Sequence, residues 1–477
     1  MTSNERLVVL VPSWMIIHCA HQQHTSSLPS SRAENFHLWL WFWFDYSIAR
    51  RTILTFRDIR QSDRIIAHPA GKALGGTTVI NGLYYIRGDK ANYDAWERLG
   101  NPGWNWNTLL PYFLRTENFA IPTSAQQAAR ITYSQTRGYG SYPKTLDQEA
   151  SVRESAARAY YEPIDGRQNL RIIQGTVKRI TSGDSVSGSE FVATGVEHTD
   201  VNGNLRSVTV KREVIFLLDR SNIGTKVGLP GVGEGFQDQP LWVLMFQASN
   251  GFTGNVPSAA FANADDIFEG DTESIAAATR GKLATWSQAI AKRLNGGVST
   301  DALIAEFEFF SQGDIIGSVF SPTLPFSWGS VHLNAAAEID NPTIDPNFLS
   351  IGFDMRAALK VGKIARKIWD TQPLSKLAGT LLNPGEAALP LNATDAQWTE
   401  FLTSSVGPAF HCIGACAMLP REMGGVVDPT LKVYGTANVR VIDAPVISHL
   451  MSGHSSAAVY ALAEKAADII KKGHVVM

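Results

Sequence analysis

Residues 68–88 read HPAGKALGGTTVINGLYYIRG, a glycine-rich turn that continues into an apolar run and ends beside an arginine. Glycine leaves the backbone without a Cβ atom, so a bulky ligand can approach it closely. The positions without a Cβ atom are Gly71, Gly75 and Gly76. The hydrogen-bonding side chains beside them are Thr77, Thr78 and Asn81. The stretch predicts a binding loop, and a glycine-rich turn without a ligand is the alternative.

A second motif lies in the C-terminal part of the chain. FHCIGACAM spans 410–418, and VRVID at 439–443 predicts a buried strand that ends in an aspartate. The alanine-rich run 455–472 carries lysines at its C-terminal end and predicts a long helix. A strand, a turn and a helix N-terminus can together direct N–H groups at an anion.

Two histidines, His411 and His454, border this motif, 43 positions apart and each beside small residues. Imidazole titrates near neutral pH, so the pair predicts acid–base chemistry; two buried core histidines are the alternative. We interpret the nearby His449 as structural. Cys412 and Cys416 have too few further ligands at recognisable spacing to predict a metal site.

With these motifs in this order, the sequence resembles the glucose–methanol–choline (GMC) oxidoreductases, a family of flavoproteins. Residues 68–88 are similar to the family's first signature, and LPGVGEGFQDQP at 229–240 is similar to a further segment of the family. Residues 411–470 are similar to its C-terminal signature, including MGGVVDPTLKVYG and AEKAADII. Three long motifs in the same order are specific for a family.

The resemblance implies an α/β fold, in which a Rossmann-like domain binds FAD and an α+β domain built on an antiparallel sheet covers the substrate. By the family pattern, both domains are discontinuous in sequence. The expected FAD-binding segments are 1–90, 166–240 and 405–477, and the expected substrate-binding segments are 91–165 and 241–404.

The resemblance also implies roles for individual residues. His411 matches the family's general base, and His454 matches the second member of the active site. A base of this kind takes the proton from a substrate hydroxyl while the carbon gives a hydride to the flavin. The residues expected to bind FAD are Gly75, Gly76, Thr77, Asn81, Gly82 and Leu83 in the first loop, Val177 at the adenine, Asp443 and Ala444 in the phosphate-side turn, and Ser455.

The chain departs from the family pattern in its first part. No GxGxxG turn occurs before residue 67. The apolar run LVVLV at 7–11 predicts a strand that resembles the family's second, but it lacks the acidic end that holds the adenosine ribose. We therefore expect the first βα unit to be missing and FAD affinity to be reduced. Gln239 also stands where relatives often have histidine.

The composition excludes several classes of protein. The 477 residues carry 42 basic and 44 acidic side chains, and a net charge of −2 predicts no nucleic-acid surface. Three cysteines argue against a disulfide framework. The aromatic run 38–44 is too short to span a membrane, and the run 7–17 has flanks unlike a signal peptide. We therefore expect no membrane anchor and slightly favour the cytoplasm over secretion.

The expected function is oxidation of a small-molecule alcohol by hydride transfer to FAD, in fungal secondary metabolism and by a monomer or homodimer. One alternative is a non-redox cyclase or dehydratase on the same scaffold that uses His411 and His454 as acid and base. The other is a truncated, inactive remnant that is unable to hold FAD. Bound flavin would distinguish the alcohol-oxidising enzyme from the inactive remnant.

Further elements are predicted from periodicity alone. Apolar runs predict strands over 170–180 and 208–218. Residues 104–117 predict a helix with aromatic packing residues, and 353–369 predict an amphipathic helix. The apolar face expected for the latter consists of Met355, Leu359, Ile364 and Ile368.

Overall fold

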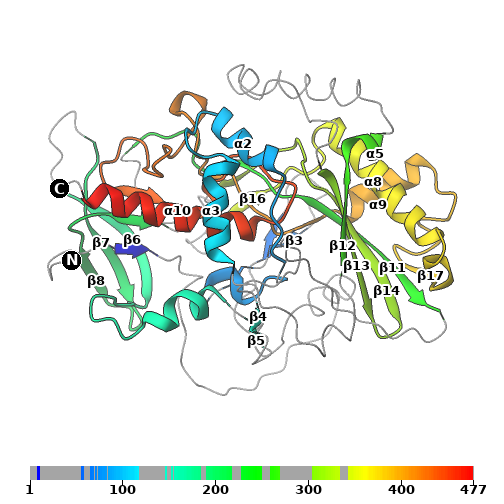
Figure 1. The fold of residues 1–477 in the computed structure, drawn as a ribbon, viewed down its shortest axis with the longest axis horizontal. Helices are drawn as coiled ribbons and strands as arrows, with labels where there is room; N and C mark the ends of the chain where they lie inside the picture. Colours follow the sequence, from blue (N-terminus) through cyan, green and yellow to red (C-terminus); the bar gives the residue numbers. More distant parts are fainter. Residues whose placement is uncertain are drawn as a thin grey trace.

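The computed structural model has two main sheets, with helices packed beside and between them (Figure 1). A long antiparallel sheet and its covering helices form one side of the view, and the C-terminal helix lies on the other. The residues that the structure describes are 8–10, 55–57, 65–68, 70, 71, 73–82, 84–117, 146, 147, 152, 153, 155–183, 190–216, 227–249, 258–268, 303–332 and 342–475.

Three short strands from distant parts of the chain form a parallel sheet in the order β1-β9-β19. They are β1 (Val8–Leu10), β9 (Val214–Phe216) and β19 (Val439–Val441). β-Branched residues dominate all three, as is typical of a parallel sheet that is buried on both faces, and Val214 is fully buried. The strands predicted from LVVLV and VRVID are therefore confirmed.

The pairing of β1 differs from one expectation. In the common doubly wound order, the first strand separates the second strand from the fourth. Here β1 pairs directly with β9, through the register of Val8 with Val214. Residues 8–10 therefore hold the place beside β9 that a first strand would hold, although Pro12 and Ser13, rather than a glycine-rich turn, follow in the sequence.

The larger sheet is antiparallel, with the order β12-β13-β14-β11-β17, and β18 pairs with one end of β11. Its strands are β11 (Pro240–Ala248), β12 (Ser258–Asn263), β13 (Leu303–Gln312), β14 (Ile315–Pro322), β17 (Ala378–Asn383) and β18 (Gly407–Pro408). The helices beside it are α5 (Ala264–Phe268), α8 (Gly352–Asp370) and α9 (Asp395–Ser405). The predicted combination of an α/β core with an antiparallel second sheet is confirmed.

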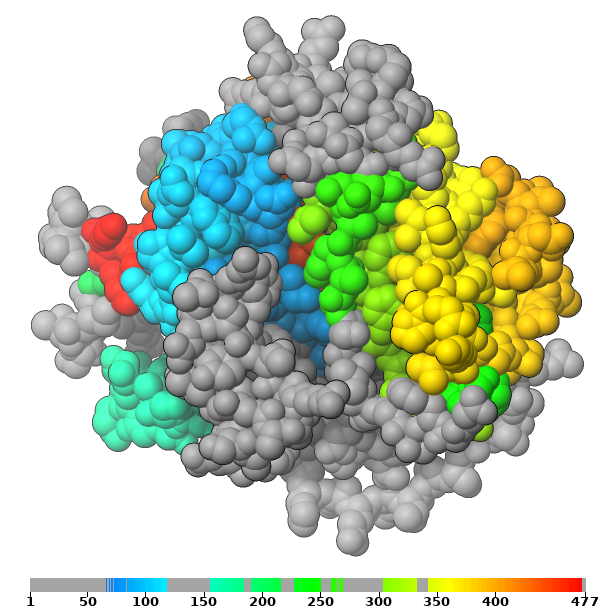
Figure 2. Space-filling model, turned by 45° about the vertical axis from the view of Figure 1, so that its right-hand side comes forward, coloured from blue at the N-terminus to red at the C-terminus, as the bar shows by residue number. Residues whose placement is uncertain are grey.

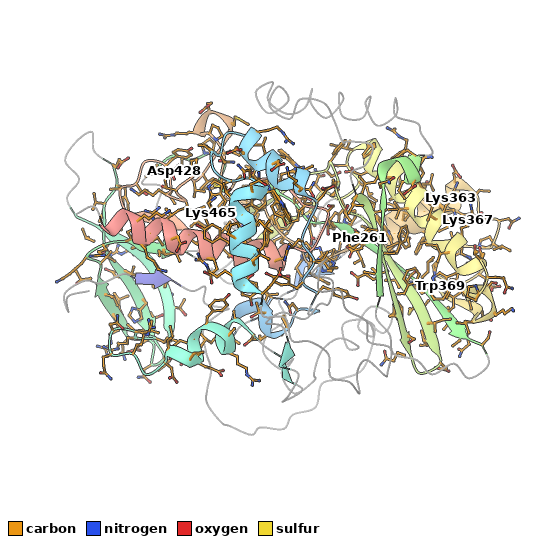
Figure 3. The ribbon with its side chains drawn as sticks, in the orientation of Figure 1. Phe261, Lys363, Lys367, Trp369, Asp428 and Lys465 are labelled. Atoms are coloured by element: carbon orange, nitrogen blue, oxygen red, sulfur yellow. The ribbon has the colours of Figure 1, made fainter. Side chains whose placement is uncertain are left out.

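Alternation along β13 separates two chemical environments. Phe307 and Phe309 point to the helix-covered face, where Phe309 packs against Trp369 of α8. Glu306 and Glu308 point to the opposite face, as the two-residue period of a strand requires. Figure 3 shows Trp369 on the side of α8 that faces the sheet. One face of the strand thus builds the core, and the other is available for polar chemistry.

Helix α8 confirms a predicted element and corrects its buried face. The predicted face of Met355, Leu359, Ile364 and Ile368 is only half-buried. The fully packed face lies beside it and consists of Phe353, Asp354, Ala357, Ala358, Val361, Gly362, Ala365 and Trp369. Small residues let the helix approach its neighbours closely: a Cβ atom on Gly362 would lie 2.7 Å from the Trp398 ring of α9 and 3.2 Å from the Phe320 ring of β14.

A short helix packs against the C-terminal helix, and a second one packs against the first. They are α2 (Lys90–Arg98) and α3 (Trp106–Thr116), and α3 packs along α10 (Ser455–Val475). A capping box between Asn105 and Thr108 starts α3. Lys465 of α10, labelled in Figure 3, lies with its Nζ 4.4 Å from the centre of the Trp104 ring. The helices predicted over 104–117 and 455–472, which correspond to α3 and α10, are confirmed.

A third sheet, in the order β6-β7-β8, is antiparallel and contains β6 (Gly175–Ser182), β7 (Ala193–Asp200) and β8 (Leu205–Thr209). The strand predicted over 170–180 therefore begins five residues later. The strand predicted over 208–218 is wrong as one element, because 210–213 turn between β8 and β9 and pass the chain to another sheet.

The remaining elements are short. They are β2 (Thr55–Arg57), β3 (Ile65–Ala67), β4 (Leu146–Asp147), β5 (Val152–Arg153), β10 (Glu234–Phe236), β15 (Gly329–His332), β16 (Thr343–Asp345), and the helical turns η1 (Gly76–Val79), η2 (Ala157–Tyr161), η3 (Glu162–Ile164), η4 (Leu374–Lys376), η5 (Arg421–Met423) and η6 (Ala444–Val446). Among the described residues, no helix is both long and apolar enough to cross a membrane. The domain boundaries given above stay predictions.

Candidate active site

The structure brings the two predicted catalytic histidines together. The ring centroids of His411 and His454 lie 4.5 Å apart, with 42° between the ring planes. They come from different elements: His411 follows β18, and His454 directly precedes α10. Figure 2 shows atoms of the C-terminal segment, in red, recessed between the blue segment near residue 80 and the green strands.

His454 is buried and held from three sides. Its backbone N–H donates to the carbonyl of Ile86 at 3.2 Å, and its ring lies 4.9 Å from that of Tyr84. Its Nε2 lies 2.9 Å from Oε1 of Glu306 and 3.6 Å from Oε1 of Glu308. Both carboxylates come from the polar face of β13, so the antiparallel sheet contributes directly to the histidine pair.

These carboxylates set the charge of the second histidine. Burial by itself would lower the pKa of His454, but the charge and hydrogen bond of Glu306, helped by Glu308, raise it above its usual value of 6.5. Burial also raises the pKa of Glu308 to about 7, against the attraction of His454. The two carboxylates thus favour the imidazolium form of His454.

His411 is held by a different set of groups. Its backbone N–H donates to Oδ1 of Asp238 at 2.8 Å, and the preceding Phe410 N–H donates to Oδ2 at 3.2 Å. This carboxyl braces a strained turn, because Phe410 has φ of 65°. Burial raises the pKa of Asp238 to about 7, although the backbone N–H groups and the Cys412 thiol act against it.

The His411 ring has a neutral hydrogen-bond partner. Its Nδ1 lies 2.6 Å from the amide oxygen Oε1 of Gln239, which directly precedes β11. Burial, followed by the positive charge of His454, lowers the pKa of His411 well below its usual value of 6.5. The site therefore favours the neutral imidazole at His411 and the protonated one at His454.

The predicted glycine loop leads into this site. Gly75 and Gly76 have φ of 93° and 56°, the left-handed region that favours glycine, and the turn they open is η1. Asn81 is half-buried, and Tyr84 three residues later contacts His454. These residues fit a flavin site because the left-handed glycine turn leaves peptide groups without a Cβ atom beside them, and Asn81 adds a carboxamide, in a loop that continues to Tyr84 at the histidine pair. Leu83 lies outside the described residues.

Other predicted cofactor residues occupy defined places. Thr77 is half-buried, and its hydroxyl accepts the Gly71 N–H at 3.4 Å; Gly82 is exposed. Asp443 caps η6, where its Oδ1 accepts the N–H of Ala444 at 2.8 Å. Ser455 is the first residue of α10, and Val177 lies in β6, in a different sheet. Their roles toward FAD stay predictions.

Two groups of side chains in the described part of the chain place possible metal-ligand atoms within 4.8 Å of one another. One contains His68, Asp238 and Cys412, and the other contains Glu306, Glu308 and His454. In both groups, hydrogen bonds already engage the carboxylates: Asp238 accepts backbone N–H groups, and Glu306 lies at the His454 ring. Cys416 belongs to neither group.

The partners of the histidines are the part of the site that sequence reasoning missed. Glu306 and Glu308 lie about 150 residues before His454, in a stretch without a recognisable motif. Their spacing of two residues in an apolar strand was the available signal, because a strand that buries one face leaves such a pair on the other. Asp238 and Gln239 were present in the QDQP segment but had been assigned no role.

Comparison with known proteins identifies the family of the chain. Sequence models of the GMC oxidoreductase family match residues 24–241 and 325–463. A glucose oxidase-like protein of Humicola fuscoatra is 38% identical, over 84% of this chain and 82% of that protein. A glucose oxidase of Penicillium chrysogenum is 27% identical, over 84% and 79%. The chain therefore belongs to the GMC oxidoreductase family, whose members bind FAD.

Solved structures share the fold. An FAD-dependent oxidoreductase from Chaetomium thermophilum has a TM-score of 0.77, with 21% identity over 91% of both chains. A fungal aryl-alcohol oxidase has a TM-score of 0.75, with 21% identity over 89% of this chain and 90% of the other. The predicted family, fold class and FAD cofactor are thus confirmed.

Proposed function

We propose that this protein oxidises the hydroxyl group of a small-molecule alcohol to a carbonyl, with His411 as general base. FAD, when bound, supplies the acceptor for the hydride that leaves the substrate carbon. The observation that carries the proposal is the side-by-side placement of His411, which faces a neutral amide, and His454, which faces a carboxylate. The residues proposed to hold the flavin are those of the loop 75–82.

The two histidines divide the proton chemistry between them. A neutral imidazole can accept the hydroxyl proton at Nε2, because Nδ1 already faces Gln239. The imidazolium of His454 uses Nε2 toward Glu306, which leaves the Nδ1–H to donate toward the same substrate oxygen. That donation places the hydroxyl and complements the negative charge that develops as its proton leaves.

The substrate classes to be tested first are chosen from the relatives. Relatives include glucose oxidases, and the fold is shared with an aryl-alcohol oxidase. Sugars and aryl alcohols are therefore the first two substrate classes to test, followed by aliphatic alcohols. A role in secondary metabolism stays a prediction.

A reconstitution experiment tests the proposal. The purified chain is incubated with FAD and desalted, and the retained flavin is measured by its visible absorbance. The three alcohol classes are then added without oxygen. We expect retained flavin, and loss of its oxidised absorbance with at least one class, with formation of the matching aldehyde, ketone or lactone. If the chain retains FAD but none of the alcohols reduces that flavin, the proposed alcohol oxidation is contradicted.

A further inference from the structure

Gln239 lies completely buried at the point where the antiparallel sheet meets the histidine loops. Its Nε2 donates to two backbone carbonyls, that of Thr323 at 2.8 Å and that of Met451 at 3.1 Å. Thr323 follows β14, and Met451 lies in the loop before α10, so the amide joins two separate parts of the chain. A carboxamide nitrogen has two hydrogens, and both are used here.

This arrangement leaves only one orientation for the amide. If it were flipped, the oxygen Oε1 would face two carbonyl oxygens at hydrogen-bond distance, with no proton between them, inside the protein. With Nε2 on the carbonyls, Oε1 faces His411 Nδ1 at 2.6 Å. An amide oxygen only accepts, so Nδ1 must carry the hydrogen. In a neutral ring, the lone pair is then on Nε2.

We propose that Gln239 is a positioning residue that fixes His411 in the tautomer with the hydrogen on Nδ1 and the basic lone pair on Nε2. The inference rests on the proposed function for its catalytic consequence, but the tautomer itself is a property of the protein. An amide suits this role because it orients the ring without a negative charge. A carboxylate, such as the one beside His454, would instead favour the protonated ring, which cannot act as a base.

The direct test reads the proton position on the ring. The protein is labelled with ¹⁵N-histidine, and long-range ¹H–¹⁵N correlation spectra are recorded for wild type, Gln239→Met and Gln239→Glu. The His411 signals are assigned by their loss in His411→Asn. We expect a protonated Nδ1 and an unprotonated Nε2 in wild type, and a mixture that includes the Nε2–H form in Gln239→Met.

Two comparisons keep this test specific. Glutamate at 239 would face the same two carbonyl oxygens, which favour its protonated form; it donates its single hydrogen to one of them, and its other oxygen still accepts from Nδ1, so Gln239→Glu should keep the wild-type tautomer. Gln237 is also buried, two residues earlier, and its Oε1 accepts the Leu450 N–H at 3.4 Å. Gln237→Met therefore removes a comparable buried amide and should leave the His411 signals unchanged. An Nε2–H ring in wild type, or no change in Gln239→Met, overturns the proposal.

The kinetic arm connects the tautomer to turnover. For an alcohol that reduces the wild-type flavin, kcat of Gln239→Met should fall about 10-fold, less than for loss of the base itself, because part of the rings keep the lone pair on Nε2, and KM should change little. Gln239→Glu should recover most of that loss. Equal kcat in wild type and Gln239→Met overturns the inference while the proposed function stands. If no alcohol is oxidised, the proposed function fails, and the spectra alone decide the role of Gln239.

Discussion

His411 and His454 lie with their rings 4.5 Å apart, yet the groups that hold them have opposite electrical character. A neutral amide orients His411, and a carboxylate at 2.9 Å holds His454. Both rings are desolvated, so burial favours the neutral form of each. Only His454 receives enough negative charge to overcome that cost.

The difference shows how one pocket can hold an acid and a base of the same residue type. A charged His454 further lowers the proton affinity of His411, because two adjacent imidazolium ions repel each other. The proton affinity of His411 thus depends on the partners that favour the charged form of His454. Four substitutions, one at His411 and three at groups around His454, test this comparison in order of decreasing effect.

Replacement of the proposed base should have the largest effect. His411→Ala removes the proton acceptor, and kcat for the alcohol should fall about 10²–10⁴-fold. His332 is exposed and pairs with Glu234 at 2.8 Å, so His332→Ala serves as the histidine control and should keep wild-type turnover. Stopped-flow reduction of the bound flavin measures both variants. Wild-type reduction rates in His411→Ala would exclude this residue as the base.

Glu306→Gln should have the largest effect on stability. The pKa of His454 is raised in the folded protein, so its contribution is fully present below pH 6.5 and is lost as pH rises through that raised pKa. Loss of the carboxylate leaves a buried cation without its partner and should cost about 3–5 kcal/mol at pH 6, and less at pH 9. Urea unfolding at both values measures the difference.

An exposed pair provides the control for this comparison. Glu234 and His332 form a carboxylate–imidazole contact of nearly the same length, with about half of each side chain exposed to solvent. Glu234→Gln should therefore cost less than about 1 kcal/mol at either pH. An equal cost in the buried and exposed pairs would contradict the view that burial gives the Glu306–His454 pair its importance.

Glu308→Gln should change the pH dependence of stability. Burial raises the pKa of Glu308 from 4.5 to about 7, so the folded state binds a proton that the unfolded state has released. Stability therefore falls as pH rises from 4.5 to about 7, and the variant should lack roughly 2 kcal/mol of that fall. Unfolding at pH 5 and pH 8 measures it, with the exposed Glu422→Gln as control. Parallel profiles for wild type and Glu308→Gln would rule out the raised pKa.

The sequence allowed prediction of those parts of the site that lie in continuous motifs. The glycine loop and both histidines could be predicted because each stands in a long run with a recognisable order of residues. Glu306 and Gln239 could not, because their partners are 148 and 172 positions away and no local pattern records that contact. Roles of this kind follow from strand register and tertiary packing, which bring Glu306 of β13 to His454 only in the folded chain.

The fold was predictable to a similar extent, and the errors have physical causes. The helix over 353–369 was correct, but half of the residues on its most closely packed face are alanine or glycine, which hydrophobic patterns underestimate. The run 208–218 is continuously strand-like, and tertiary structure divides it between two sheets at 210–213. Residues 8–10 form a strand as predicted, but its neighbour β9 is determined by long-range pairing.

The smallest expected effect is that of replacing Tyr84, whose ring lies 4.9 Å from that of His454. The interaction of Tyr84 with Glu308 lowers the pKa of that carboxyl, so Tyr84→Phe should raise it above the wild-type value of about 7. Because the folded state then keeps its proton to higher pH, stability should continue to fall over a wider range, and the variant should lose about 1 kcal/mol more at pH 8 than at pH 5. Tyr85→Phe is the matched control, since its phenol also makes a buried hydrogen bond, to Thr116, but does not contact Glu308. Both variants should lose a similar amount at pH 5 by urea unfolding, and only Tyr84→Phe should diverge at pH 8. The same pH profile for the two variants would separate Tyr84 from the charge balance of the histidine pair and leave it a packing role against the His454 ring.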